Sequence, residues 1–126
     1  MAQAVFAAAD AVEHAIHHNA GTTRKPLRFG PHCLHENRKG SYRSERLLFA
    51  TYFNAGVRVY DTADPEHPVE VAHWVSQTPP GQAAPQANDL FVDSDGLIWV
   101  TDRGGGGVFV LEPEPELAAL MREAEL

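Results

Sequence analysis

The chain has 126 residues, of which 44% are hydrophobic, 21% charged and 9% aromatic, the size and composition of one small globular domain. These values exclude a disordered, collagen-like or disulfide-stapled chain. The formal net charge of -7 argues against nucleic acid or an anionic membrane as partner, because both attract cationic proteins. No apolar run approaches the roughly 18 residues of a membrane span. Without a recognisable secretory signal, and with Cys33 as the single cysteine, we expect a cytoplasmic protein.

Residues 1–26 predict an amphipathic helix and a linker. Strong helix formers run from Ala2 to about His18, with apolar side chains recurring every three or four residues. Asn19 and Gly21 then end the pattern, because both tolerate the left-handed conformation that closes a helix.

Residues 27–113 change to a period of two, which is typical of short strands. The expected strands of the first unit, about 28–76, include Arg46–Phe53, Val57–Tyr60 and Val69–Val75. Those of the second unit, about 86–112, are Asp89–Asp93, Leu97–Thr101 and Val108–Leu111. The proline-rich segment Gln77–Pro85 between the units predicts a loop. Residues 114–126 predict a short helix with an acidic start and with Leu117, Leu120 and Met121 on one side.

The two units repeat each other. Leu48–Thr51 aligns with Ile98–Thr101 at an offset of 50, and Gly56–Tyr60 aligns with Gly107–Leu111 at an offset of 51. Further back, His32–Leu34 aligns with Asn88–Leu90 at an offset of 56. Meanders that repeat at this spacing are the blades of β-propellers. We therefore expect an all-β partial β-propeller of two antiparallel meander blades, with four plus three strands, an N-terminal α-helix and a short C-terminal helix.

Two blades cannot close a propeller ring, which needs roughly four to eight. The open sheet faces then require a homo-oligomer, another propeller subunit, or a longer parent chain of which this is a part. The alternative is a small closed sandwich in which the two sheets face each other.

The segment Gly56–Ala72, with its hydrophobic strand, its aspartates and its Asp-Pro turn, resembles the LVIVD-repeat β-propellers. Asn88–Asp102 and the glycine-rich strand that follows are similar to the closing blade of the same family. The resemblance implies a propeller and no single chemistry. In this motif we expect Asp61 and Asp64 to accept backbone hydrogen bonds within the turn. We also expect the two tryptophans, Trp74 and Trp99, to pack between blades.

Polar residues at the start of the innermost strands should gather at one mouth of the channel. The candidates are His32, His35, Glu36, Asn37, Asn88, Asp89, Asp102 and Arg103. Four of these have side chains suited to a divalent metal, calcium or zinc, namely Asn88, Asp89, His32 and Glu36. The alternative is that they bond to backbone or water.

Two functions follow from these patterns. The favoured one is a protein-interaction or scaffolding module without an assigned catalytic residue. The other is a metal-dependent, lactonase-like hydrolase assembled from several chains, because Asn88–Asp89 and Trp99 are also similar to a blade of the gluconolactonase and senescence-marker propellers. That resemblance implies Asn88 as a calcium ligand. Cys33 has no evident partner residue for nucleophilic catalysis.

Overall fold

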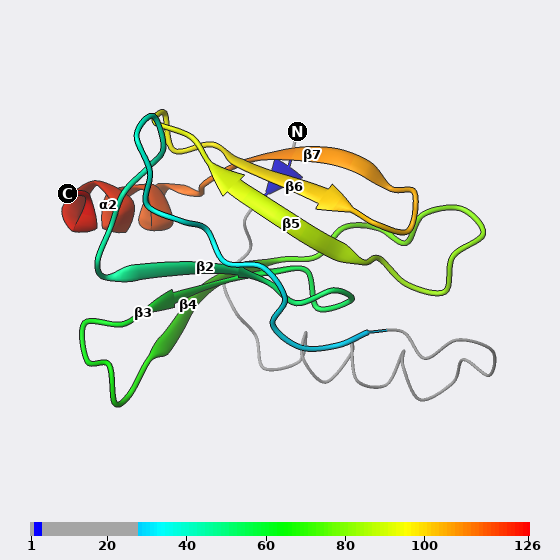
Figure 1. The fold of residues 1–126 in the computed structure, drawn as a ribbon, viewed down its shortest axis with the longest axis horizontal. Helices are drawn as coiled ribbons and strands as arrows, with labels where there is room; N and C mark the ends of the chain where they lie inside the picture. The colour runs from blue at the N-terminus through cyan, green and yellow to red at the C-terminus, as the bar shows by residue number, and fades with distance from the viewer. Residues whose placement is uncertain (1, 4–27) are drawn as a thin grey trace.

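The structure, a computed structural model, describes residues 2–3 and 28–126 (Figure 1). Its elements are β1 (Ala2–Gln3), β2 (Leu47–Thr51), β3 (Val57–Asp61), β4 (Val69–Trp74), β5 (Ala87–Val92), β6 (Ile98–Asp102), β7 (Gly107–Glu112) and α2 (Pro115–Ala124). The expected strands after residue 46 and the C-terminal helix are therefore confirmed. No helix in the described ranges is both long and apolar enough to cross a membrane.

The helix expected at the N-terminus begins in two residues that form a strand instead. Ala2 and Gln3 pair in parallel with Leu111 and Glu112 of β7. The remainder of that predicted helix lies outside the described residues.

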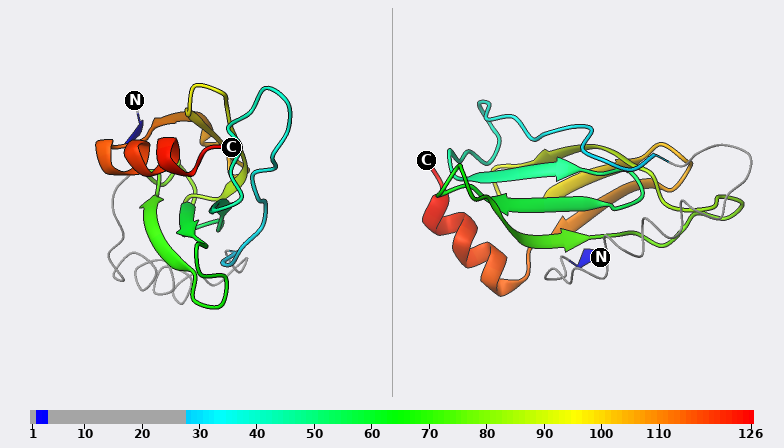
Figure 2. Two further views of the ribbon diagram at one scale, coloured as in Figure 1. Left: turned by 90° about the vertical axis from the view of Figure 1, so that its left-hand side faces the viewer. Right: turned by 90° about the horizontal axis from the view of Figure 1, so that it is seen from below.

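The strands form two sheets of consecutive antiparallel neighbours. One contains β2-β3-β4, and the other contains β5-β6-β7 with β1 added beside β7. The sheets lie in two layers with α2 at one end (Figures 1 and 2). The molecule is thus mostly β, with two antiparallel three-stranded units and a C-terminal helix.

The prediction of four strands in the first unit is wrong in its first strand. Residues near Leu34 form only an isolated bridge with Ala50 of β2. The backbone hydrogen bonds of this segment go to β2 but span only a few residues. The N–H groups of His32 and His35 donate to the carbonyls of Thr51 and Phe49, at 2.9 and 3.0 Å. A contact this short forms a bridge and no continuous ladder.

An apolar core lies between the sheets and explains why apolar and polar residues alternate along the strands. Its buried members include Phe49, Val57 and Val59 from one sheet and Leu90, Ile98 and Val100 from the other. The helix α2 adds its predicted face, because Leu117 and Met121 are buried and Leu120 packs against them. Burial of this many apolar side chains is the main force holding the layers together.

The two tryptophans have different environments. Trp74 packs between the sheets with its ring 5.0 Å from that of Phe109. Trp99 lies on the outer side of β6, is 42% exposed, and donates its indole N–H to Asp93 at 2.8 Å. The expectation of packing between sheets therefore holds for Trp74 and is not met for Trp99 within this chain.

The turn after β3 has the expected polar anchors. The Oδ1 atom of Asp61 accepts the N–H of Ala63 at 2.9 Å, and that of Asp64 accepts the N–H of Glu66 at 3.1 Å. Both aspartates thus satisfy backbone donors that have no strand partner, as the motif predicts.

Candidate functional site

The predicted channel-mouth residues His32 and Asn88 meet in the structure. His32 Nδ1 lies 2.8 Å from the backbone carbonyl oxygen of Asn88. Because a carbonyl can only accept, Nδ1 carries the proton in this contact. The contact joins the segment before β2 to β5, as expected for equivalent positions in neighbouring units.

His35 is also close to β5, but both of its ring nitrogens are used. Nε2 donates to the carbonyl of Tyr42 at 2.8 Å, and Nδ1 accepts the N–H of Val92 at 3.1 Å. This pattern requires the neutral tautomer protonated at Nε2. His35 therefore satisfies two backbone groups and has no nitrogen left for a metal ion.

Glu36 and Asn37 do not join this group. Glu36 is exposed and pairs with Arg38 at 3.2 Å. The Asn37 amide pairs with the backbone of Ser44, donating from Nδ2 at 2.8 Å and accepting at Oδ1 at 3.0 Å. These contacts are those of residues that shape a loop.

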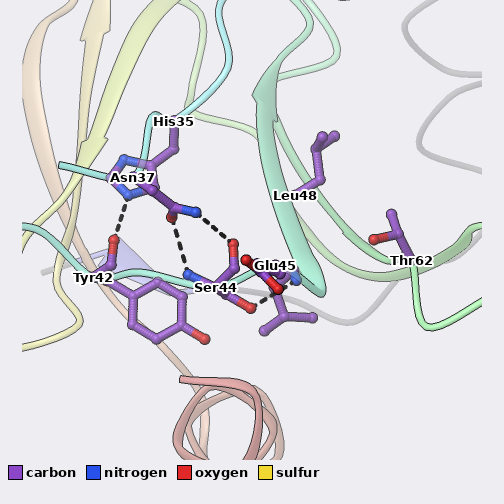
Figure 3. Close-up of a pocket in the computed structure, with 8 residues that line it drawn as sticks. His35, Asn37, Tyr42, Ser44, Glu45, Leu48 and Thr62 are labelled. Atoms are coloured by element: carbon purple, nitrogen blue, oxygen red, sulfur yellow. Dashed lines mark hydrogen bonds between the residues drawn. The ribbon is translucent and has the colours of Figure 1, made fainter. Parts of the chain in front are cut away.

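A pocket of about 210 Å³ adjoins this loop (Figure 3). It is lined by His35, Asn37, Tyr42, Ser44, Glu45, Leu47, Leu48 and Thr62. Sequence reasoning named His35 and Asn37 but none of the other lining residues. Thr62, the most distant of them in the chain, reaches the pocket because its N–H donates to the carbonyl of Arg46 at 2.9 Å. Since the amide of Asn37 and both ring nitrogens of His35 already have partners, the pocket offers few free polar groups for a ligand.

Cys33 lies beside two of the predicted residues without forming a reactive thiolate. Its Sγ is 3.2 Å from His32 Nδ1. Burial raises the pKa of the Cys33 thiol, and the charge and hydrogen bond of Asp89 raise it further. The imidazole nitrogen facing the sulfur already carries a proton, so it cannot accept that of the thiol. This trio lacks the activated thiolate of a cysteine nucleophile.

Asp102 and Arg103 hold the turn between β6 and β7. The Asp102 carboxylate accepts three backbone N–H groups, those of Gln86 and Gly104 at 2.6 Å and that of Gly106 at 3.2 Å. Arg103 is the next residue, and its guanidinium carbon lies 5.8 Å from the ring centre of Phe53.

Three of the four proposed metal ligands already have other partners. His32 uses Nδ1 on a carbonyl, Glu36 is paired with Arg38, and Asp89 accepts the N–H of the next residue, Leu90, at 2.8 Å. Within residues 2–3 and 28–126, no three His, Cys, Asp or Glu side chains gather as a metal-binding group. No hydrolytic step through a metal is derived from this arrangement.

Two arginines and one histidine surround one aromatic ring, and we call this group the Phe53 cluster (Arg28, His32, Phe53 and Arg103). Sequence reasoning named His32 and Arg103 as candidates but missed Arg28 and Phe53. The guanidinium carbon of Arg28 lies 5.6 Å from the ring centre, and the His32 ring centre lies 4.5 Å away. The members come from three separate stretches of the chain. No local pattern in the sequence could have indicated that these stretches meet at one ring.

The outer side of the β5-β6-β7 sheet is apolar, and we call it the open face (Phe91, Trp99, Val108 and Val110). Phe91 lies opposite Trp99, and Trp99 lies opposite Val110, so these three form one row across the strands. Val108 is 63% exposed and Trp99 42%. A row of large apolar side chains on an exposed sheet is the composition of an interaction surface.

The repeat relates the open face to the core. Residues that point inward from the β2-β3-β4 sheet align with residues that point outward from the β5-β6-β7 sheet. The pairs are Phe49 with Trp99, Val57 with Val108 and Val59 with Val110. The open face of the second unit is therefore the counterpart of the face that packs against the other sheet in the first unit. In the second unit the aligned side chains are exposed.

The outer side of the β2-β3-β4 sheet differs, and we call it the closed face (Ala50, Arg58 and His73). All three residues are buried, Arg58 to 1% exposure. Arg58 Nη1 donates to Glu70 Oε1 at 2.9 Å. Burial and the charge of Arg58 lower the pKa of His73, more than Glu70 raises it. The two outer sheet surfaces are thus unlike in both exposure and chemistry.

Comparisons of this chain with protein-family models, with curated proteins and with solved structures found no match. The resemblance to the LVIVD-repeat propellers therefore stays a prediction.

Proposed function

We propose that this chain is a protein-interaction module of propeller type, and that the open face of one copy packs against the open face of a second copy. The observation that carries the proposal is the repeat of the packed face Phe49, Val57, Val59 as the exposed face Trp99, Val108, Val110. In a sandwich closed by a two-fold relationship, equivalent residues would all point inward. Here the residues of the first unit point inward and the aligned residues of the second unit point outward. This is the arrangement of consecutive propeller blades, in which each sheet packs one face on the next sheet.

The choice of a second copy rests on the unlike outer surfaces. The closed face is already buried at Arg58 and His73, so it offers no apolar counterpart. In a solution of this chain alone, the available partner for an open face is another open face. Such pairing gives an isologous dimer, the commonest symmetric assembly. Trp99, in the middle of the row across the strands, is of the type that dominates interface energetics.

The experiment is the solution mass of the purified chain by light scattering after gel filtration. A single chain has a mass of 13.8 kDa, and we expect twice this value. Val108→Lys places a charge at the most exposed apolar position of the open face and should return the mass to that of one chain. The matched control is Val69→Lys, because Val69 is similarly exposed, at 59%, but lies on β4. It should remain dimeric.

Either of two results would contradict the proposal. One is a wild-type chain that stays monomeric as its concentration is raised, since burial of the open face would then have no role. The other is equal loss of the dimer in both lysine variants, because the effect would not depend on the open face. Thermal unfolding of each variant verifies that it is folded when its mass is measured.

A further inference from the structure

The Phe53 cluster brings two arginines from distant parts of the chain to one ring. The backbone of Phe53 joins the segments that carry them. Phe53 exchanges two hydrogen bonds with Ala87, at 3.1 and 2.9 Å, and forms a bridge with Phe29, the neighbour of Arg28. The Arg103 N–H donates to the carbonyl of Gln86, beside Ala87, at 3.0 Å. The backbone segments that carry the two arginines are thus joined through Phe53 and its partner Ala87.

Neither arginine of the cluster has a carboxylate partner among the described residues. Arg46 and Arg58, by contrast, form ion pairs with acidic side chains. The aspartate next to Arg103 in sequence, Asp102, uses both carboxylate oxygens on backbone N–H groups. In a chain with a net charge of -7, two unneutralised guanidinium groups on one ring form a local positive field that attracts anions.

Phe53 itself has an unusual backbone conformation. Its φ angle is +51°, the one positive value at a non-glycine residue in the described ranges. A bulky residue is rarely found there. Such conformations persist where the surroundings hold them and are concentrated at binding sites. Here the conformation places the Phe53 ring, which is buried, under the cations that cover it.

We propose that the Phe53 cluster binds a phosphate group, with Arg28 and Arg103 as its two charged ligands and His32 beside them. A phosphate carries close to two negative charges at neutral pH, which matches two guanidinium charges. Its oxygens can accept hydrogen bonds from several directions, whereas a carboxylate has only two oxygens in one plane. Arginine provides paired donors that suit this geometry.

The experiment is a titration of the full chain with inorganic phosphate, followed by the amide signals in nuclear magnetic resonance spectra at constant ionic strength. We expect saturable shifts at Phe53 and Arg103, with a Kd on the order of 1 mM. Arg28→Gln and Arg103→Gln should each weaken binding by about tenfold or more. The matched control is Arg43→Gln, which removes an equal charge from another exposed arginine without a described ion pair. It should bind phosphate as the wild type does.

Three results would overturn the proposal. They are shifts that do not saturate, shifts spread over the surface without a focus at Phe53, and an equal loss of affinity in the Arg43 variant. The last would mean that only the net charge matters. Because both arginines are exposed, the glutamine variants should unfold at the wild-type temperature, and this measurement separates lost binding from lost structure.

Discussion

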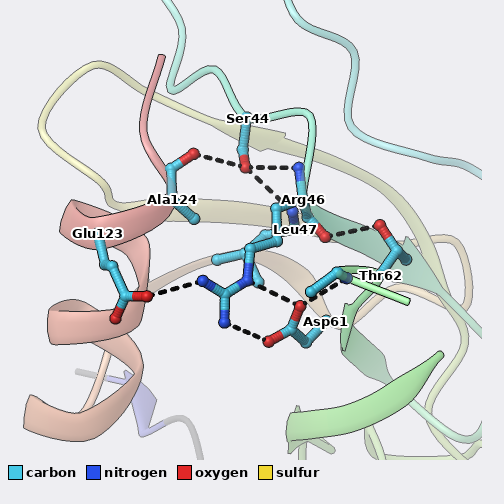
Figure 4. A network of polar contacts seen from close by, with 8 residues as sticks. Ser44, Arg46, Leu47, Asp61, Thr62, Glu123 and Ala124 are labelled. Carbon is cyan, nitrogen blue, oxygen red and sulfur yellow. Dashed lines mark hydrogen bonds and ion pairs between the residues drawn. The ribbon is translucent and has the colours of Figure 1, made fainter. Parts of the chain in front are cut away.

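Arg46 holds the carboxylate of Asp61 with two hydrogen bonds, Nε to Oδ1 at 2.9 Å and Nη2 to Oδ2 at 2.7 Å (Figure 4). The same guanidinium donates from Nη1 to Glu123 of α2 at 2.8 Å. Ser44 strengthens this junction by donating to the carbonyl of Ala124 at 2.8 Å. One arginine therefore links the start of β2, the end of β3 and the C-terminal helix.

The pairing makes Asp61 a source of stability at neutral pH. Hydrogen bonds from Arg46, and then from the backbone of Ala63, lower the pKa of Asp61. A lowered pKa in the folded state stabilises the protein above the usual carboxyl value of about 3.9, and this stability is lost as the pH falls through the folded value. We expect Asp61→Asn to reduce the thermal midpoint at pH 7 and to have less effect at pH 2.

The matched control for this prediction is Glu123→Gln. The side chain of Glu123 is 69% exposed, against 18% for Asp61, so water screens its contact with Arg46 more strongly. Its loss should change the midpoint less than the loss of Asp61. Equal reductions of the thermal midpoint by the two substitutions at pH 7 would refute the account given for Asp61. A reduction by Asp61→Asn that is the same at pH 7 and at pH 2 would refute it as well.

A second prediction concerns His35. We expect His35→Ala to reduce the free energy of unfolding by about 2–3 kcal/mol, because it leaves the Val92 N–H without its acceptor and removes one of the two donors to the Tyr42 carbonyl. His67→Ala is the control, since this side chain is 79% exposed and its loss should cost no more than about 0.5 kcal/mol. Urea unfolding measures both values. A His35 variant as stable as the wild type would show that the ring does not hold the two segments together.

A third prediction compares two glycines with similar backbone angles. Gly56 has a φ of +73° and Gly81 a φ of +76°. A Cβ at Gly56 would collide with the backbone of Trp74, at 2.9 Å from its carbonyl carbon, whereas a Cβ at Gly81 would meet nothing within 4 Å. We therefore expect Gly81→Ala to cost about 1 kcal/mol, the backbone term alone. Gly56→Ala should cost about 3 kcal/mol or more.

Chemical denaturation of the two alanine variants tests this comparison. Because the φ angles are similar, the difference between the variants isolates the close approach of Gly56 to the end of β4. Similar losses at both positions would mean that the hairpin can shift to accept a side chain at Gly56.

The local elements of this fold could be predicted because their signals are local. Alternating apolar residues in Val57–Tyr60 and Val108–Leu111, and the glycine turns beside them, determine strands and hairpins over a few residues. The helix near the C-terminus was equally evident from the spacing of Leu117 and Met121. The strand expected near Leu34 did not form because its backbone pairs with β2 over only a few residues, a limit that no short pattern records.

The candidate site shows the same division. The sequence by itself placed His32 and Asn88 at equivalent points of two repeated units, and their contact at 2.8 Å follows from that equivalence. Only the tertiary structure decided that Trp99 faces outward, and that Arg28 and Arg103 cover one ring. The physical reason is that alternation along a strand tells which residues share a face, whereas the packing of one sheet on another decides which face is buried.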